Sequence, residues 1–89
     1  MNKYEKTLYR QWNKERDEAA LSFNVDVFKA FYMKWKGKSF FKADLPEDDS
    51  IIEFIMRKLV ISMKNPPSDK LNEARNWLLK NDYDLTKLW

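Results

Sequence analysis

The stretch IIEFIMRKLVISMK, residues 51–64, decides the fold. Two apolar rows run along it at helical spacing, Ile51–Ile55–Leu59 and Ile52–Met56–Val60. Only Glu53, Arg57 and Lys64 mark a strip that faces water, and Glu53 precedes Arg57 by one helical turn, which favours an ion pair. A helix that is apolar almost all round is covered by its neighbours, so the pattern predicts a central helix.

The residues around this stretch predict where its helix begins and ends. Ser50 followed by Glu53 forms a capping box, and Asp48 and Asp49 place negative charge where the helix dipole favours it. The Asn-Pro-Pro segment at residues 65–67 stops the helix. The run is rich in β-branched residues and could alone form a strand, but its length of about fourteen residues and its capping box favour a helix.

The N-terminal part of the chain predicts a helix over residues 2–21, which contain no glycine or proline. Asn2 followed by Glu5 fits a helix start, because their side chains can exchange hydrogen bonds with the free amides. An apolar stripe follows at Tyr4, Leu8 and Trp12 and resumes at Ala19 and Phe23. The run at residues 13–18 is fully polar, which predicts that this half of the helix is loosely docked.

A second helix is expected from Ser22 or Asn24 to about Lys36. It ends at Gly37, where the left-handed conformation of a helix cap costs least. Its apolar face is formed by Phe28, Phe31, Tyr32 and Trp35. One bent helix over residues 2–36 is the alternative, and we favour two helices.

The C-terminal part predicts a last long helix over roughly residues 69–81, capped by Ser68. Its core stripe is Leu71, Ala74 and Leu78, with Trp77 beside it. The tail at residues 82–89 ends on Leu88 and Trp89, and we expect these apolar side chains to fold back onto the bundle. The whole chain, residues 1–89, is therefore predicted to be one all-α domain. It is a compact bundle of about four helices with a short extended connector between the second and third.

Composition excludes several kinds of chemistry. The 89 residues are 44% hydrophobic and 35% charged, a globular composition with room for one core. Cysteine and histidine are absent, which removes the usual zinc ligands, the thiol nucleophile and the commonest general base at neutral pH. No glycine-rich phosphate loop or metal-ligand spacing is present, so we predict that the protein is not an enzyme and carries no cofactor or metal.

The hydropathy pattern predicts a cytoplasmic protein. No uninterrupted apolar run approaches the roughly eighteen residues of a membrane span. The N-terminus, MNKYEKTLYR, lacks the hydrophobic region of a signal peptide. We therefore expect no membrane partner.

An acidic segment, DLPEDDS at residues 44–50, follows directly on a basic one. A cluster of carboxylates can hold a divalent cation, but this spacing fits no calcium-binding loop. Acids at a helix start explain three of its four carboxylates, so we expect no metal there. The neighbouring basic and acidic segments predict a molecule that is electrically polarised across this connector.

The basic segment, YMKWKGKSFFK at residues 32–42, alternates lysines with aromatic residues and contains no acid. Lysines track phosphates and exposed rings stack on bases, so this alternation is typical of a nucleic-acid surface. Helical spacing assigns Tyr32 and Trp35 to the core and sets Lys34 off the face of the other lysines. The predicted nucleic-acid-binding residues are Lys29, Lys36, Lys38, Phe40, Phe41 and Lys42. One ring of the Phe40–Phe41 pair would stack on a base.

These features predict a small non-enzymatic accessory protein that contacts single-stranded nucleic acid, or the backbone of DNA or RNA. The alternative is a protein-interaction module, such as an inhibitor or adaptor acting on a replication, recombination or host-defence protein. A third possibility is weak self-association through the Tyr4, Leu8 and Trp12 stripe; otherwise the protein is a monomer. The length and residue usage resemble those of small accessory proteins carried by phages.

Overall fold

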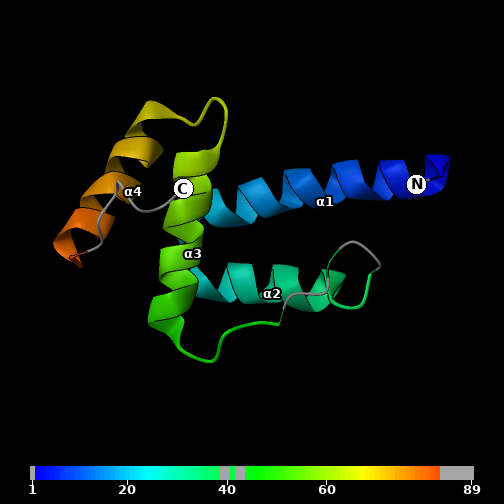
Figure 1. Cartoon of the computed structure of the whole chain (residues 1–89), viewed down its shortest axis with the longest axis horizontal. Coiled ribbons are helices and arrows are strands. Elements are labelled where there is room, and N and C mark those ends of the chain that lie inside the picture. Colours follow the sequence, from blue (N-terminus) through cyan, green and yellow to red (C-terminus); the bar gives the residue numbers. More distant parts are fainter. Residues whose placement is uncertain (1, 39–40, 42–43, 83–89) are drawn as a thin grey trace.

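Figure 1 shows the computed structural model, which describes residues 2–38, 41 and 44–82. Within these residues four helices follow one another: α1 (Lys3–Leu21), α2 (Val25–Trp35), α3 (Asp49–Ser62) and α4 (Ser68–Lys80). α1 and α2 lie side by side and antiparallel, α3 crosses both, and α4 packs on α3. The fold is the predicted all-α bundle of about four helices.

α1 and α2 are separate helices, as favoured by the sequence. The side chain of Asn2 accepts a hydrogen bond from the amide of Glu5 at 2.8 Å, which confirms the predicted start of α1. Between the helices Phe23 adopts a positive φ of 51°, and the Asn24 side chain accepts hydrogen bonds from the first amides of α2. Gly37 follows α2 with a φ of 91°, which glycine adopts at little cost.

α3 is the central helix, because it contacts each of the other three. Ile52, Met56 and Val60 are fully buried, whereas Ile51 is 46% exposed. The other side of the core is aromatic. Around the Phe41 ring, the centroids of Tyr32, Trp12 and Phe31 lie 5.0, 5.4 and 5.5 Å away.

The prediction that Arg57 belongs to a solvent-facing strip of α3 is wrong. This side chain is buried at 7% exposure, with its guanidinium carbon 4.0 Å from the centre of the Phe23 ring and 5.3 Å from that of Trp77. Its Nη1 lies 2.6 Å from Oε2 of Glu53, an ion pair whose atoms are not aligned for a hydrogen bond. Arg57 is covered because α4 and the α1–α2 turn pack over it, and this desolvation lowers its pKa.

The predicted caps of α3 and α4 are shifted in the structure. Asp48, rather than Ser50, is the N-cap of α3, and its carboxylate accepts hydrogen bonds from the amide and hydroxyl of Ser50 at 2.9 and 2.7 Å. These hydrogen bonds lower the pKa of Asp48. Ser68 is the first residue of α4, and Pro67 before it supplies no side-chain hydrogen bond. A carboxylate accepts a hydrogen bond more strongly than a hydroxyl does, which explains why Asp48 is the N-cap instead of Ser50.

The polar half of α1 is held more firmly than its composition predicts. Glu15 accepts hydrogen bonds from Nζ of Lys34 at 2.7 Å and from Nε1 of Trp35 at 3.3 Å, both on α2. The hydrogen bond from Lys34 is the main cause of a lowered pKa at Glu15. The prediction of loose docking is therefore wrong, because a carboxylate on α1 joins it to the end of α2.

Three further predictions concern the C-terminal tail, membrane spans and the core stripe of α4. The expected return of Leu88 and Trp89 onto the bundle lies outside the described residues. Throughout the described ranges, each helix is too short or too polar to serve as a membrane span. The core stripe of α4 is confirmed at Ala74 and Leu78, which are fully buried.

Candidate nucleic-acid interface

The lysines predicted from the basic segment differ in what they contact. Lys29 on α2 forms an ion pair with Asp49 at the start of α3, at a distance of 2.9 Å. This contact raises the pKa of Lys29 and neutralises its charge locally. Lys34 is likewise paired, with Glu15. Of the described lysines in this segment, Lys36 and Lys38 are exposed and form no ion pair within the described residues.

The chain turns back on itself after Gly37 instead of leaving the bundle in an extended form. Lys38 donates its amide to the carbonyl of Trp35 at 3.2 Å, and Phe41 donates its amide to the carbonyl of Lys38 at 3.0 Å. Lys38 and Phe41 form an isolated antiparallel bridge. This turn directs Phe41 inward, whereas residues 44–47 have no regular structure.

Phe41 is not available to stack on a base. Its side chain is only 8% exposed and is surrounded by the rings of Trp12, Phe31 and Tyr32. The prediction that Phe41 contributes to the binding surface is wrong, because the aromatic core between α1 and α2 needs this ring to close it. Phe40 and Lys42, the remaining predicted residues, lie outside the described residues.

Two of the four carboxylates of the acidic connector have partners in the structure. Asp48 caps α3, and Asp49 pairs with Lys29. Within the described ranges, no three acidic side chains come together in a way that could hold a metal ion. The structure therefore uses these two acids to begin α3 and to join it to α2.

The outer face of α1 carries a row of cations that the linear density of lysine does not reveal. Its members are Lys3, Lys6, Arg10 and Lys14, and all four side chains are exposed. Their spacing of three, four and four residues keeps them within an arc of about 80° on a helix that turns about 100° per residue. They span about 16 Å along the helix axis. We refer to these four residues as the α1 cationic row.

The α1 cationic row faces away from the core. Trp12, which is buried, lies about 180° around the helix from Lys3. Leu8 packs against the core from the same inner side. None of the four cations forms an ion pair or a side-chain hydrogen bond within the described residues. The three-four-four spacing on an unbroken helix is the sequence signal that identifies the row.

The charges of the molecule are segregated between its two ends. Residues 2–15 and 33–38, which include the Lys34–Glu15 pair, hold seven basic and two acidic residues, a formal charge of +5. The other described residues hold eight basic and eleven acidic residues, a formal charge of −3. In Figure 1 the N-terminal half of α1 and the turn after α2 lie at the same end of the molecule, away from α4.

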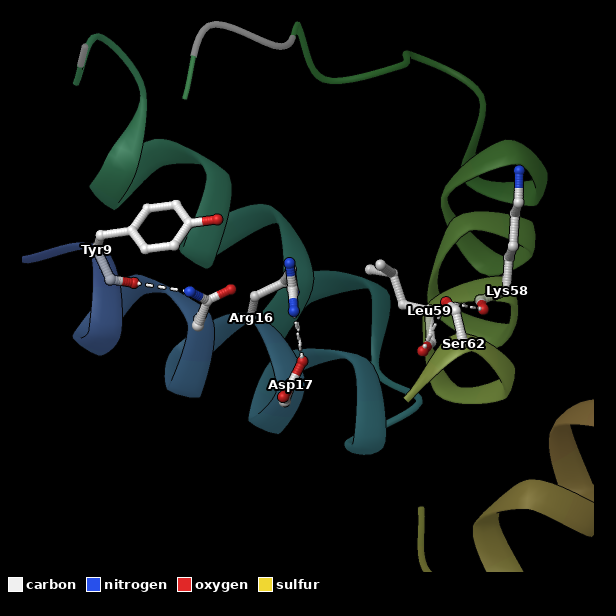
Figure 2. A network of polar contacts seen from close by, with 7 residues as sticks. Tyr9, Arg16, Asp17, Lys58, Leu59 and Ser62 are labelled. Carbon is white, nitrogen blue, oxygen red and sulfur yellow. Dashed lines mark hydrogen bonds and ion pairs between the residues drawn. The ribbon is translucent and has the colours of Figure 1, made fainter. Parts of the chain in front are cut away.

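A shallow cavity of about 340 Å³ lies between α1 and the end of α3. Figure 2 shows Arg16 and Asp17 of α1 opposite Leu59 and Ser62 of α3. Arg16 donates to Asp17 at 3.1 Å, and the Ser62 hydroxyl donates to the carbonyls of Lys58 and Leu59 at 2.8 and 3.2 Å. The Ser62 hydroxyl therefore donates to backbone carbonyls of its own helix, and not to a side chain that could act as a general base.

The stripe considered for self-association is mostly used inside the molecule. Trp12 is buried and Leu8 is half-buried, so Tyr4, at 71% exposure, is the one member that faces solvent. Self-association stays a prediction, but one that only Tyr4 of the stripe can support.

Comparisons of the chain with protein-family models, with curated proteins and with solved structures gave no match.

Proposed function

We propose that the protein is a small, non-enzymatic accessory protein that binds the phosphate backbone of nucleic acid through the outer face of α1. The observation that carries this proposal is the α1 cationic row, four exposed cations in line without a partner among the described residues. Cations on such a surface displace counterions from phosphates, and this release supplies most of the affinity for nucleic acid.

The spacing of the α1 cationic row is compatible with contacts to the phosphate backbone of nucleic acid. Successive members rise by about 4.5–6 Å along the helix axis, against about 3.4 Å per phosphate along one strand, so the four cations span about five phosphates. The end of α2 lies at the same end of the molecule, and Lys36 and Lys38, which follow it in the sequence, add two exposed cations. The segregated charge would orient the molecule with this end toward a polyanion during encounter.

The test compares two variants of equal net charge. The first, Lys3→Gln/Lys6→Gln/Lys14→Gln, removes three cations from the row. The second, Lys64→Gln/Arg75→Gln/Lys80→Gln, removes three exposed cations from the other end of the molecule. Glutamine is a good helix former, so both variants should keep their helices, which circular dichroism would verify.

Binding to labelled oligonucleotides would be measured by fluorescence anisotropy over a range of salt concentrations. The row variant should bind more than about tenfold more weakly at roughly 0.1 M salt, because each lost duplex phosphate contact removes about 0.9 from the slope of log K against log salt. The control variant should bind like the wild type. Equal losses in both variants, or no binding by the wild type at low salt, would contradict the proposal.

A third variant, Lys36→Gln/Lys38→Gln, tests the surface predicted from the basic segment. If these lysines take part, the slope should fall by about 1.8, again from about 0.9 per contact. An unchanged slope would limit the interface to α1.

The same segregated charge also favours an acidic protein surface, which is the second candidate function. An inhibitor or adaptor of this kind would be captured from a nuclease-treated lysate by the wild type and not by the row variant. Capture that disappears after nuclease treatment would support nucleic acid instead.

A further inference from the structure

The geometry points to the major groove of double-stranded DNA as the site that receives the outer face of α1; this inference rests on the proposed function. Its starting point is the position of the helix. α3 crosses α1 over the C-terminal half of α1, and the N-terminal half runs beyond α3 (Figure 1). α2 and the turn after it cover only the inner side of that half, where Trp12 meets Phe41.

The dimensions of the helix match one kind of groove. An α-helix with its side chains is about 10–12 Å across, and the major groove of B-form DNA is about 12 Å wide. The α1 cationic row, about 16 Å long, would follow roughly five base pairs of this groove. The major groove of A-form RNA is deep and narrow, and side chains cannot read it.

The order of the cations around the helix assigns roles to three of them. Arg10 lies at the centre of the arc, with Lys6 and Lys14 about 40° to either side. A central side chain faces the floor of a groove, and flanking side chains face its walls, where the phosphates are. Arg10 would therefore meet the base edges, where a guanidinium can donate two hydrogen bonds to guanine, and Lys6 and Lys14 would meet the two backbones.

The exposed rings are poorly placed for single-stranded nucleic acid. Single strands are held by aromatic side chains on which bases stack. Tyr4 and Tyr9, the exposed rings of α1, lie about 120° and 100° around the helix from Arg10. Phe41 is buried. The described part of the row thus offers charge without a stacking surface, which favours a duplex.

The first experiment measures binding to three probes at one salt concentration: a 16-base-pair DNA duplex, an RNA duplex of the same sequence, and a single DNA strand with the same number of phosphates. We expect the DNA duplex to bind at least about tenfold more tightly than either of the others, in keeping with groove insertion. Equal binding of all three, or tighter binding of the single strand, would overturn the inference and leave the proposed function intact. No binding of any probe would overturn both.

The second experiment tests the position of Arg10. Arg10→Gln and Lys14→Gln each remove one cation. Lys14→Gln loses a phosphate contact and should lower the slope of log K against log salt by about 0.9, whereas Arg10→Gln should lower it less, because Arg10 meets bases. The wild type should prefer a duplex with G·C pairs to one with only A·T pairs, and Arg10→Gln should lose this preference, whereas Lys14→Gln should keep it. A preference that survives in Arg10→Gln, or is absent from the wild type, would contradict the placement of Arg10 at the groove floor.

Discussion

Arg57 is the residue whose surroundings differ most from what its place in the sequence predicts. Its guanidinium is buried against two aromatic rings, and Glu53 compensates its charge. Removing one partner of a buried ion pair leaves an uncompensated charge, whereas replacing the pair by apolar groups costs little. The sequence could not predict this burial, since the i, i+4 spacing of the pair is equally typical of an exposed helix face.

Glu53→Gln should therefore lower the free energy of unfolding by about 2 kcal/mol, less than for a fully buried pair because Glu53 keeps some exposure. The double variant Glu53→Gln/Arg57→Met should recover part of this loss, because methionine fills the space between the rings without a charge. Urea unfolding followed by circular dichroism measures both. A double variant less stable than Glu53→Gln alone would contradict the account.

Glu15 provides a pH-dependent contact between α1 and α2. Its pKa in the folded state is lowered from 4.5, mainly by the hydrogen bond from Lys34. Stability from such a group is present above the unfolded pKa and is lost as pH falls through the folded pKa. Glu15→Gln should thus reduce stability at pH 7 by about 0.5–1 kcal/mol, the range of exposed pairs. The difference from the wild type should shrink below pH 4.5.

The matched control for Glu15 is Glu18, which is exposed and one turn further along α1. Glu18→Gln should leave the free energy of unfolding nearly unchanged at both pH values. If the two variants behaved alike across the acid range, the contact of Glu15 with Lys34 and Trp35 would not stabilise the fold in solution.

At the scale of the elements, the sequence predicts the helices better than their caps. Apolar periodicity locates all four, and Asn2 and Gly37 mark two ends correctly. At α3 several capping residues stand side by side, and local hydrogen bonding selects Asp48. Phe41 could not be placed from the pattern, because the turn that buries it depends on contacts with Trp12 and Tyr32.

The observed helix caps predict different effects on stability when Asn24 and Ser68 are replaced by alanine. Asn24→Ala should lower the free energy of unfolding by about 1 kcal/mol, since the Asn24 side chain accepts hydrogen bonds from two amides of α2. Ser68→Ala should have almost no effect, because Ser68 is the first residue of α4 and makes no capping hydrogen bond. Thermal unfolding compares the two. A larger effect at Ser68 would mean that it is the cap after all.

At the scale of the whole molecule, the main feature is the segregation of charge. The high density of lysines along residues 29–42 predicts a basic surface at the end of α2, but Lys29 and Lys34 form ion pairs within the fold. Helical spacing instead collects Lys3, Lys6 and Arg10 with Lys14 on one open face. Which cations are free depends on tertiary ion pairs, and these cannot be predicted from local sequence.

The measurement that tests the central claim most directly is a titration of isotope-labelled protein with a DNA duplex, followed by the backbone amide signals in NMR spectra. The account predicts that the largest shift changes fall within residues 3–14 and that those of α3 and α4 stay small. It also predicts that the changes reverse on addition of salt, as expected for contacts with phosphates. Spectra that do not change at low salt, or changes confined to α4, would contradict the proposed interface.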